Sequence, residues 1–148
     1  MNTQLDQVRN FMIAGGQSTR SEPISQLDRR EALLRLDLIA EELDELREAL
    51  NDPSTQYFQN LTVKVDKIAA PDALTDILYV VFGTYHTLGL AHLAEAAFNE
   101  VQTSNMSKVD PATGLCIRDA NTGKILKPAN YVSPNLAKLF TTNNELSQ

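Results

Sequence analysis

The sequence predicts an all-α protein, a helical bundle with a short β-hairpin near its C-terminal end. Apolar residues recur at helical spacing through most of the N-terminal two-thirds of the chain. Glycine or proline follows the ends of these periodic stretches, as at Gly15, Pro53 and Gly89. Two of the helices carry more apolar surface than one chain of 148 residues can cover, so we expect oligomerisation to complete the bundle.

Length and composition favour one soluble domain. A chain of 148 residues can bury a sizeable core, and we expect a single domain over residues 1–148. Its expected parts are a helical core (1–108), a hairpin and loop (109–134) and a short tail (135–148). There is no apolar run of membrane-spanning length, no secretory signal pattern and only one cysteine, so we expect a cytoplasmic protein without a membrane partner.

The acidic balance restricts the partners. A net charge of −6 and a pI near 4.8 argue against binding to a nucleic-acid backbone, which requires a basic face. A single nucleotide is not excluded, because a divalent cation held by carboxylates can supply the positive charge that its phosphates need.

The elements of the first half follow from spacing and stop signals. The spacing predicts a helix over 3–14 and a second helix from Leu27 or Asp28 to about Leu50. The segment 54–70 is ambiguous, because its apolar spacing suggests a helix while Thr62 and Val63 weaken it; a kinked helix that continues through Pro71 is the alternative. The second helix has an expected core stripe: Leu36, Ile39, Leu43, Leu46 and Leu50.

The second half begins with the most apolar helix of the chain. Residues 72–88 are apolar on nearly every side, which is typical of a buried central helix. A further helix is expected over 91–106, and a last short one over 136–140. Segments 115–118 and 124–126 flank the turn sequence D-A-N-T-G and predict the β-hairpin. One polar line, within a sector of about 80°, interrupts the apolar helix: Asp72, Asp76, Tyr79, Gly83 and His86.

The candidate chemistry lies in five carboxylates on two helices. Glu41, Glu42 and Glu45 form an E-E-x-x-E pattern whose spacing lets the side chains converge, and Asp72 and Asp76 can do the same from a facing helix. Hard divalent ions such as Mg²⁺ prefer these oxygen ligands. Two or more such ions can activate a water and stabilise a phosphoryl displacement.

Structural explanations compete with this interpretation. A glutamate-rich helix face is more often a solvated surface than a site. Asp72 can be an acid that stabilises a helix N-terminus, but Asp76 lies a full turn further in and fits that role poorly. His86 is best explained as a core histidine with its hydrogen bonds satisfied, and Cys116 has no partner motif.

The ordered set of motifs resembles the all-α nucleoside triphosphate pyrophosphohydrolases. E-E-L-D-E at 41–45, followed by D-A-L-T-D-I-L-Y-V-V at 72–81, is similar to the pattern of the superfamily that includes MazG, the dimeric dUTPases and phosphoribosyl-ATP pyrophosphohydrolase. F-M-I-A-G-G-Q at 11–17, F-N-E-V-Q-T-S-N-M-S-K at 98–108 and G-K-I-L-K-P-A-N-Y at 123–131 resemble its small MazG-like branch. The likeness covers about residues 11–134.

The resemblance implies a homodimer or homotetramer that cleaves a nucleotide between its α- and β-phosphates, with Mg²⁺ or Mn²⁺, two or three ions per site. Glu42, Glu45 and Asp76 match metal ligands of the family, and Glu41 matches a ligand or the group that orients the attacking water. Many relatives carry a glutamate three residues before the aspartate. Ala73 stands there in this chain, and Asp72 is the expected substitute, which leaves the number of ions open.

The same resemblance implies the substrate contacts. Asn105 and Lys108 match nucleotide and phosphate contacts of the family; the alternative for Lys108 is a cation at a helix C-terminus. Lys124, Lys127 and Tyr131 can close over the phosphates or form an ordinary solvated loop. For Tyr79, packing is the alternative to stacking on a base, and somewhat the stronger one.

The expected enzyme is a (deoxy)nucleoside triphosphate pyrophosphohydrolase that cleans or shapes the nucleotide pool. By analogy with the small MazG-like relatives, dGTP is slightly favoured and dUTP comes next. The alternatives are phosphoribosyl-ATP hydrolysis, and a helical dimer module that binds a nucleotide without turnover.

Overall fold

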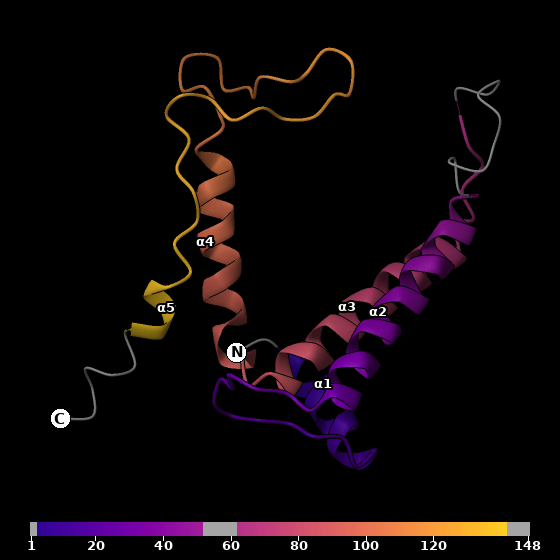
Figure 1. Cartoon of the computed structure of the whole chain (residues 1–148). Helices are drawn as coiled ribbons and strands as arrows, with labels where there is room; N and C mark the ends of the chain where they lie inside the picture. The colour runs from indigo at the N-terminus through magenta and orange to yellow at the C-terminus, as the bar shows by residue number, and fades with distance from the viewer. Residues whose placement is uncertain (1–2, 52–61, 142–148) are drawn as a thin grey trace. The chain divides into compact units, whose positions relative to one another are not determined.

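The structure is a computed structural model that describes residues 3–51 and 62–141, and it is helical (Figure 1). Within these ranges there is no β-strand, so the all-α prediction is confirmed. The chain forms two compact units, an N-terminal unit (Met1–His92) and a C-terminal unit (Leu93–Gln148). The helical elements are α1 (Thr3–Ala14), α2 (Arg29–Ala49), α3 (Ala69–Thr87), a 3₁₀ turn (Ala91–Leu93), α4 (Ala94–Met106) and α5 (Lys138–Thr141).

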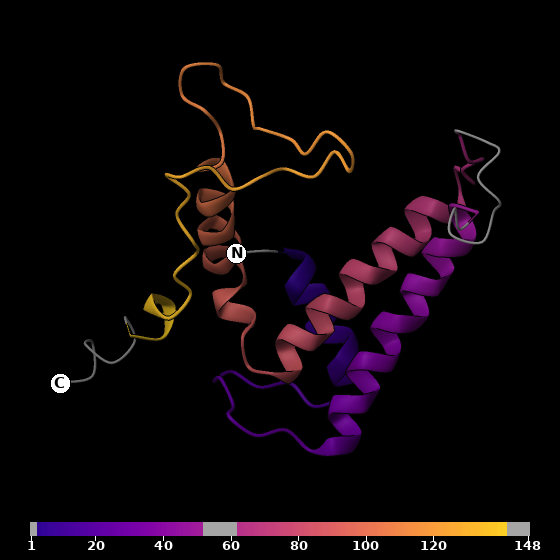
Figure 2. The ribbon, with the colours of Figure 1, turned by 45° about the horizontal axis from the view of Figure 1, so that its top comes forward.

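The N-terminal unit is built on the pair α2 and α3. Both views show the two helices side by side along their lengths (Figures 1 and 2), and α1 packs against α3. A Cβ atom at Gly83 of α3 would lie 3.1 Å from Nη1 of Arg35, so this glycine allows the buried arginine of α2 to approach the backbone. The core side chains of this unit are small or come from α1: Leu5, Val8, Met12, Ala49, Ala70 and Ala73.

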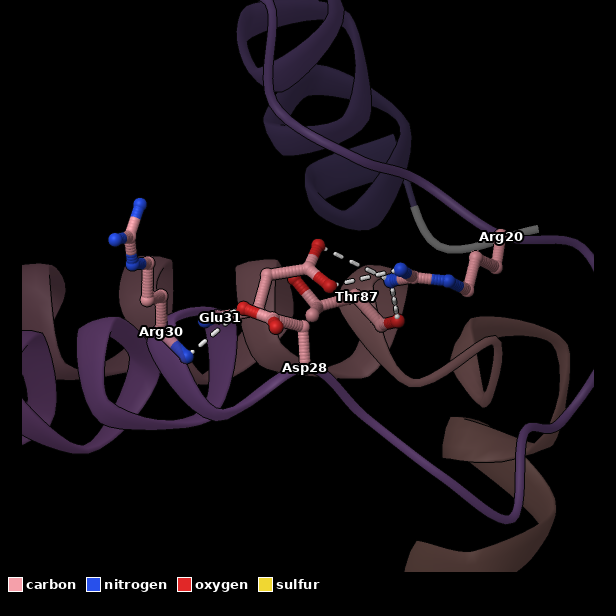
Figure 3. A network of polar contacts seen from close by, with 5 residues as sticks. All are labelled: Arg20, Asp28, Arg30, Glu31 and Thr87. Carbon is pink, nitrogen blue, oxygen red and sulfur yellow. Dashed lines mark hydrogen bonds and ion pairs between the residues drawn. The ribbon is translucent and has the colours of Figure 1, made fainter.

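The loop between α1 and α2 is fastened to the facing ends of α2 and α3 (Figure 3). Arg20 donates to both carboxylate oxygens of Glu31, at 3.3 and 2.8 Å, and to the carbonyl oxygen of Thr87 at 2.5 Å. Asp28 caps α2 by accepting from the backbone N–H groups of Arg30 and Glu31. The same loop passes so close to Gly89 (φ +71°) that a Cβ there would lie 1.8 Å from the carbonyl oxygen of Glu22.

The predicted core stripe of α2 is wrong at two positions. Leu36 is 64% exposed and Leu43 is 41% exposed, while Arg35 is buried. The buried central position expected for α3 is also wrong, because Leu74 and Leu78 are 50% and 54% exposed. The physical reason is that each of these helices is covered on one side only, by its partner and α1, so a helix that is apolar all round leaves apolar surface uncovered.

None of the described helices is by itself long and apolar enough to cross a membrane. Only α3 taken together with the helical stretch 91–106 reaches that length and composition, as a bent pair, which is weak evidence of a span.

The ambiguous segment before α3 is not helical over residues 62–68, and only its last two residues, Ala69 and Ala70, belong to α3. Residues 62–66 have no regular structure, and the rest of the predicted helix, 54–61, lies outside the described residues. The carboxylate of Asp66 accepts from the backbone N–H groups of Ile68 and Ala69, so it caps the start of α3. Pro71 lies in the first turn of α3, as predicted, where its missing N–H costs nothing.

The C-terminal unit packs a long irregular segment against α4. Ser104, buried on α4, donates to the carbonyl oxygen of Val132 at 2.8 Å. Glu100 accepts from the backbone N–H of Asn135 and forms an ion pair with Lys138. These contacts fix the return path of the chain along α4.

The predicted β-hairpin is not formed as paired strands. Among the described residues of this region there are only isolated antiparallel bridges, Val109 with Cys116 and Arg118 with Ile125. The turn itself is well made, because Asp119 accepts from the backbone N–H groups of Asn121 and Thr122. Ile117 and Ile125 are 58% and 44% exposed, so the apolar side chains of this region are not packed on another surface. An isolated pair of strands without such packing is only marginally stable, and paired strands do not form here.

Candidate active site

The five predicted carboxylates lie on the two helices that face each other. Glu42 of α2 and Asp76 of α3 are partly buried, whereas the other three side chains are exposed. Burial raises the pKa of the Glu42 carboxyl, and the negative charges of Glu45, Asp76, Glu41 and Asp72 raise it further, in that order. All four other carboxylates therefore lie close enough to Glu42 to act on its ionisation.

The carboxylate cluster (Glu41, Glu42, Glu45, Asp72 and Asp76) is an electrostatic neighbourhood rather than a closed coordination shell. Within residues 3–51 and 62–141, no three His, Cys, Asp or Glu side chains are close enough together to hold an ion. The convergence expected from i, i+3 and i+4 spacing is thus not present in the side-chain conformations of this structure. The two helices bring the residues near Glu42, but their side chains do not converge on one point.

The charges around Glu42 are all of one sign. Every charged group that shifts the pKa of Glu42 is an acid, so no lysine or arginine offsets the cluster there. Oxygen-only donors with uncompensated negative charge are what Mg²⁺ and Mn²⁺ prefer. By the chemistry of its donors, the cluster therefore fits a hard divalent ion.

A hollow of about 750 Å³ adjoins the cluster where α2 ends and α3 begins. Glu45 of α2 and Asp72 of α3 both line it, together with Lys64 and Lys67 of the connecting segment. These two lysines were not predicted as site residues from the sequence, because the apolar spacing of their ambiguous segment suggested a helix. The signal that could have found them is K-V-D-K, two cations directly before the helix that carries the aspartates.

The polar line of α3 divides into a part that packs and a part that faces the cluster. Tyr79 meets the Phe11 ring edge-on, with centroids 5.8 Å apart at 76°, which supports the packing alternative. His86 is buried with Nε2 2.8 Å from the carbonyl oxygen of Leu5, which confirms the expected core histidine. Asp72 and Asp76 are the part of the line that reaches the cluster.

Four of the predicted substrate contacts meet in the C-terminal unit, around the ring of Tyr131. Lys127 Nζ lies 4.7 Å from the ring centroid and Lys108 Nζ lies 5.6 Å from it. Lys108 also donates to Oδ1 of Asn105 at 2.8 Å. The pKa of the Tyr131 hydroxyl is lowered by its hydrogen bonds with Ser104 and Ser133, and then by the charges of Lys127 and Lys108. We call Asn105, Lys108, Lys127 and Tyr131 the lysine–tyrosine cluster.

Lys124, the remaining predicted substrate contact, is not part of this cluster in the structure. Its backbone carbonyl accepts from the N–H of Asp119, and its side chain is exposed with no hydrogen bond or ion pair to any described residue. Lys127, three residues after Lys124 in the same loop, is the lysine that reaches the Tyr131 ring.

Comparison with known protein families gives a match. The sequence pattern of the family described as phosphoribosyl-ATP pyrophosphohydrolase matches residues 8–105, about two-thirds of the chain. The matched region contains the second half of α1, all of α2 and α3 and nearly all of α4, and with them the whole carboxylate cluster. No curated protein matches the chain.

Proposed function

The chain belongs to the phosphoribosyl-ATP pyrophosphohydrolase family, within the MazG-like superfamily, and is a hydrolase of acid anhydrides; we propose that it converts a nucleoside triphosphate and water to the monophosphate and pyrophosphate. The proposed substrate is a deoxynucleotide, with dGTP slightly favoured and dUTP next, by analogy with the small MazG-like enzymes that the sequence resembles. The proposed cofactor is Mg²⁺ or Mn²⁺.

The observation that carries this proposal is the all-acidic environment of Glu42. Four carboxylates from two facing helices raise the pKa of Glu42, and every charged group that shifts it is negative. Glu42, Glu45 and Asp76 would hold the ions. Asp72 would substitute for the glutamate that many relatives carry at the position of Ala73. Glu41 would hold an ion or orient the attacking water. Bound divalent ions supply positive charge for the phosphates and lower the pKa of a water nucleophile.

The lysine–tyrosine cluster is the proposed contact for the nucleotide. Its two ammonium groups and the amide of Asn105 are suited to phosphate oxygens, because charge-assisted hydrogen bonds to phosphate are strong and directional. Lys124 and Tyr79 remain proposed contacts of the second rank, since the first has no described side-chain partner and the second is packed on Phe11.

A homodimer or homotetramer is the proposed working form. Large apolar side chains on α1, α2 and α3 are exposed in a single chain, and a stable soluble protein covers such surface. Light scattering at micromolar concentration tests this, because a monomeric mass would contradict it. The exposed set includes Phe11, Ile13, Leu33, Leu34, Leu36, Leu43, Leu74 and Leu78.

Two other functions compete. Hydrolysis of phosphoribosyl-ATP is the activity after which the matching family is described, and the match ends before the C-terminal segment that carries Lys127 and Tyr131. A nucleotide-binding module without turnover would use the same residues for binding alone.

A substrate panel with Mn²⁺ separates these functions. The eight common ribo- and deoxynucleoside triphosphates, dITP, dUTP and phosphoribosyl-ATP are each incubated with the full chain, and pyrophosphate and monophosphate are quantified. We expect stoichiometric pyrophosphate and monophosphate from a deoxynucleotide, abolished by EDTA. Stepwise release of single phosphates would contradict α–β cleavage, turnover of phosphoribosyl-ATP alone would establish the first alternative, and binding without any product the second.

A further inference from the structure

The hollow beside the carboxylate cluster is built from both helices and from the segment that joins them. Glu45 lines it from the last turns of α2 and Asp72 from the first turn of α3. Lys64 and Lys67 line it from the connecting segment. Two proposed metal ligands and two ammonium groups therefore share one cavity of about 750 Å³.

The described part of the connecting segment, residues 62–68, is held in place by backbone and side-chain hydrogen bonds to both helix ends. The N–H of Asp66 donates to the carbonyl oxygen of Ala49 at 2.9 Å, and the side-chain amide of Asn51 donates to the carbonyl oxygen of Lys64. The Asp66 carboxylate accepts from Ile68 and Ala69 at 2.9 and 3.0 Å. The backbone positions of both lysines are thus fixed relative to Glu45 and Asp72.

The ammonium groups of the hollow form no ion pair within the described chain. Neither Lys64 nor Lys67 is paired at salt-bridge distance there, and both side chains are exposed. The carboxylate between them in sequence, Asp66, accepts from the N–H groups of Ala69 and Ile68, and these hydrogen bonds, followed by the charge of Lys64, lower its pKa.

The composition of the lining identifies which part of a nucleotide fits. No aromatic side chain is among the described residues that line the hollow, so these residues offer a base no stacking surface. The acids that line the hollow are Glu45, Glu48, Asp66 and Asp72. Carboxylates alone would repel a phosphate chain, but divalent ions held by Glu45 and Asp72, together with the ammonium groups of Lys64 and Lys67, would present positive charge to it.

We propose that this hollow holds the phosphate chain of the substrate and, after cleavage, the pyrophosphate product, with Lys64 and Lys67 binding phosphate oxygens opposite the metal-loaded Glu45 and Asp72. This inference rests on the proposed function. It adds a second cationic group, in the same unit as the carboxylates, to the lysine–tyrosine cluster of the other unit.

The test is the binding of inorganic pyrophosphate to the full chain with Mg²⁺, measured by titration calorimetry. Lys64→Gln with Lys67→Gln removes both charges, and we expect at least a tenfold weaker affinity, since each lost charge-assisted contact is substantial. Arg29→Gln with Arg30→Gln is the matched control. It makes the same change in net charge at the far end of α2, about 30 Å from the hollow for a helix of that length, and we expect affinity within about twofold of wild type, since exposed charges so far apart are screened.

A charge-conserving variant guards against a folding defect. Lys64→Arg with Lys67→Arg keeps both cations and should retain most of the affinity. If Lys64→Gln with Lys67→Gln and the control Arg29→Gln with Arg30→Gln weaken pyrophosphate affinity equally, the proposal is overturned, because the effect then depends on net charge alone. Wild-type affinity in the doubly neutral variant would overturn it as well.

Kinetics separate a failure of this inference from a failure of the proposed function. If the wild type hydrolyses a triphosphate while the doubly neutral lysine variant keeps its KM and its inhibition by pyrophosphate, only the phosphate hollow is wrong. If no triphosphate is hydrolysed by the wild type, the proposed function is wrong, and the pyrophosphate titration still decides whether the hollow binds phosphate.

Discussion

The two units of the molecule carry opposite and unbalanced charges at their candidate sites. In the N-terminal unit, the charges that act on Glu42 are all negative, and together with burial they raise its pKa. In the C-terminal unit, the serine hydrogen bonds and then the two lysine charges lower the pKa of Tyr131. The surroundings of Glu42 disfavour a negative charge, so that site attracts a cation. The surroundings of Tyr131 favour a negative charge, so that site attracts an anion.

Under the proposed function, the carboxylates would bind the cation of the ligand and the lysines its phosphates. A metal-bound polyphosphate is a ligand with both parts, a cation that carboxylates bind and an anion that lysines bind. A structural role for either cluster would require local compensation, as Glu31 receives from Arg20. Among the described residues, no cation shifts the pKa of Glu42, and neither Lys108 nor Lys127 forms an ion pair, which is the argument for proposing that both clusters serve a ligand.

The largest expected effect comes from Asp76→Asn, which breaks the cation half of the comparison. The change removes a charge and a strong oxygen donor at nearly constant shape, so activity should fall by orders of magnitude. Without metal, the variant should be as stable as wild type or more so, because one repelling charge is gone. Wild type should gain roughly 2.7 kcal/mol at an Mn²⁺ concentration a hundredfold above Kd, and the variant should lose most of that gain.

Thermal melts of both proteins, with EDTA and with Mn²⁺, decide the matter. A structural Asp76 predicts the opposite pattern, in which the metal-free variant melts lower and the response to metal persists. Equal metal-induced shifts in the two proteins would show that Asp76 is not a ligand.

A smaller effect is expected from Lys108→Ala, which tests the anion half. Loss of one phosphate-contacting cation should raise KM about tenfold and lower kcat moderately, since such a contact acts in both the ground and the transition state. Metal affinity should stay nearly unchanged, because Lys108 is not one of the proposed metal ligands. Arg118→Ala is the matched control, an exposed cation of the same unit outside the lysine–tyrosine cluster. Kinetics of Lys108→Ala that match this control would favour the helix C-terminal role.

The same contrast explains what could be predicted from the sequence. Helices are local, so periodicity and caps located α1 with its observed bounds and α2 to within two residues. The carboxylates could be assigned to a common neighbourhood because they belong to two long consecutive helices. Asp28 and Gly89 act as the expected start and stop signals.

The failures concern tertiary and non-helical features. Periodicity says which residues share a face of α2, but not that Arg35 would be buried beside Gly83 while Leu36 stayed exposed. The apolar spacing of 54–70 suggested a helix, so Lys64 and Lys67 were not predicted to line a hollow. The hydrogen bonds of Asp66 to Ile68 and Ala69 show that the helix begins only after these lysines, and spacing alone does not locate that start. Hairpin chemistry predicted the turn at Asp119 correctly, but strands also need a surface on which to pack.

The smallest expected effect sharpens the comparison within one helix, because Glu31 and Glu42 both lie on α2 and their pKa values shift in opposite directions. The hydrogen bond from Arg20, followed by that from Ser18 and the charges of Arg20 and Arg35, lowers the pKa of Glu31 below 4.5. Glu31→Gln should leave metal binding intact and lower the unfolding free energy by about 1 kcal/mol at neutral pH, about 3 °C in Tm for a chain of this size.

The sign of its pH dependence follows from linkage. A carboxyl whose pKa is lower in the folded than in the unfolded state stabilises the fold at pH values above the unfolded pKa, and this stabilisation is lost as the pH falls through the folded pKa. The difference in Tm between wild type and Glu31→Gln should therefore be constant from neutral pH down to about 4.5, the ordinary value, and shrink below it. Melts in EDTA across this range measure it. A difference that persists unchanged into acid would mean that the carboxylate charge of Glu31 contributes nothing, and that the contrast with Glu42 is one of packing rather than of charge.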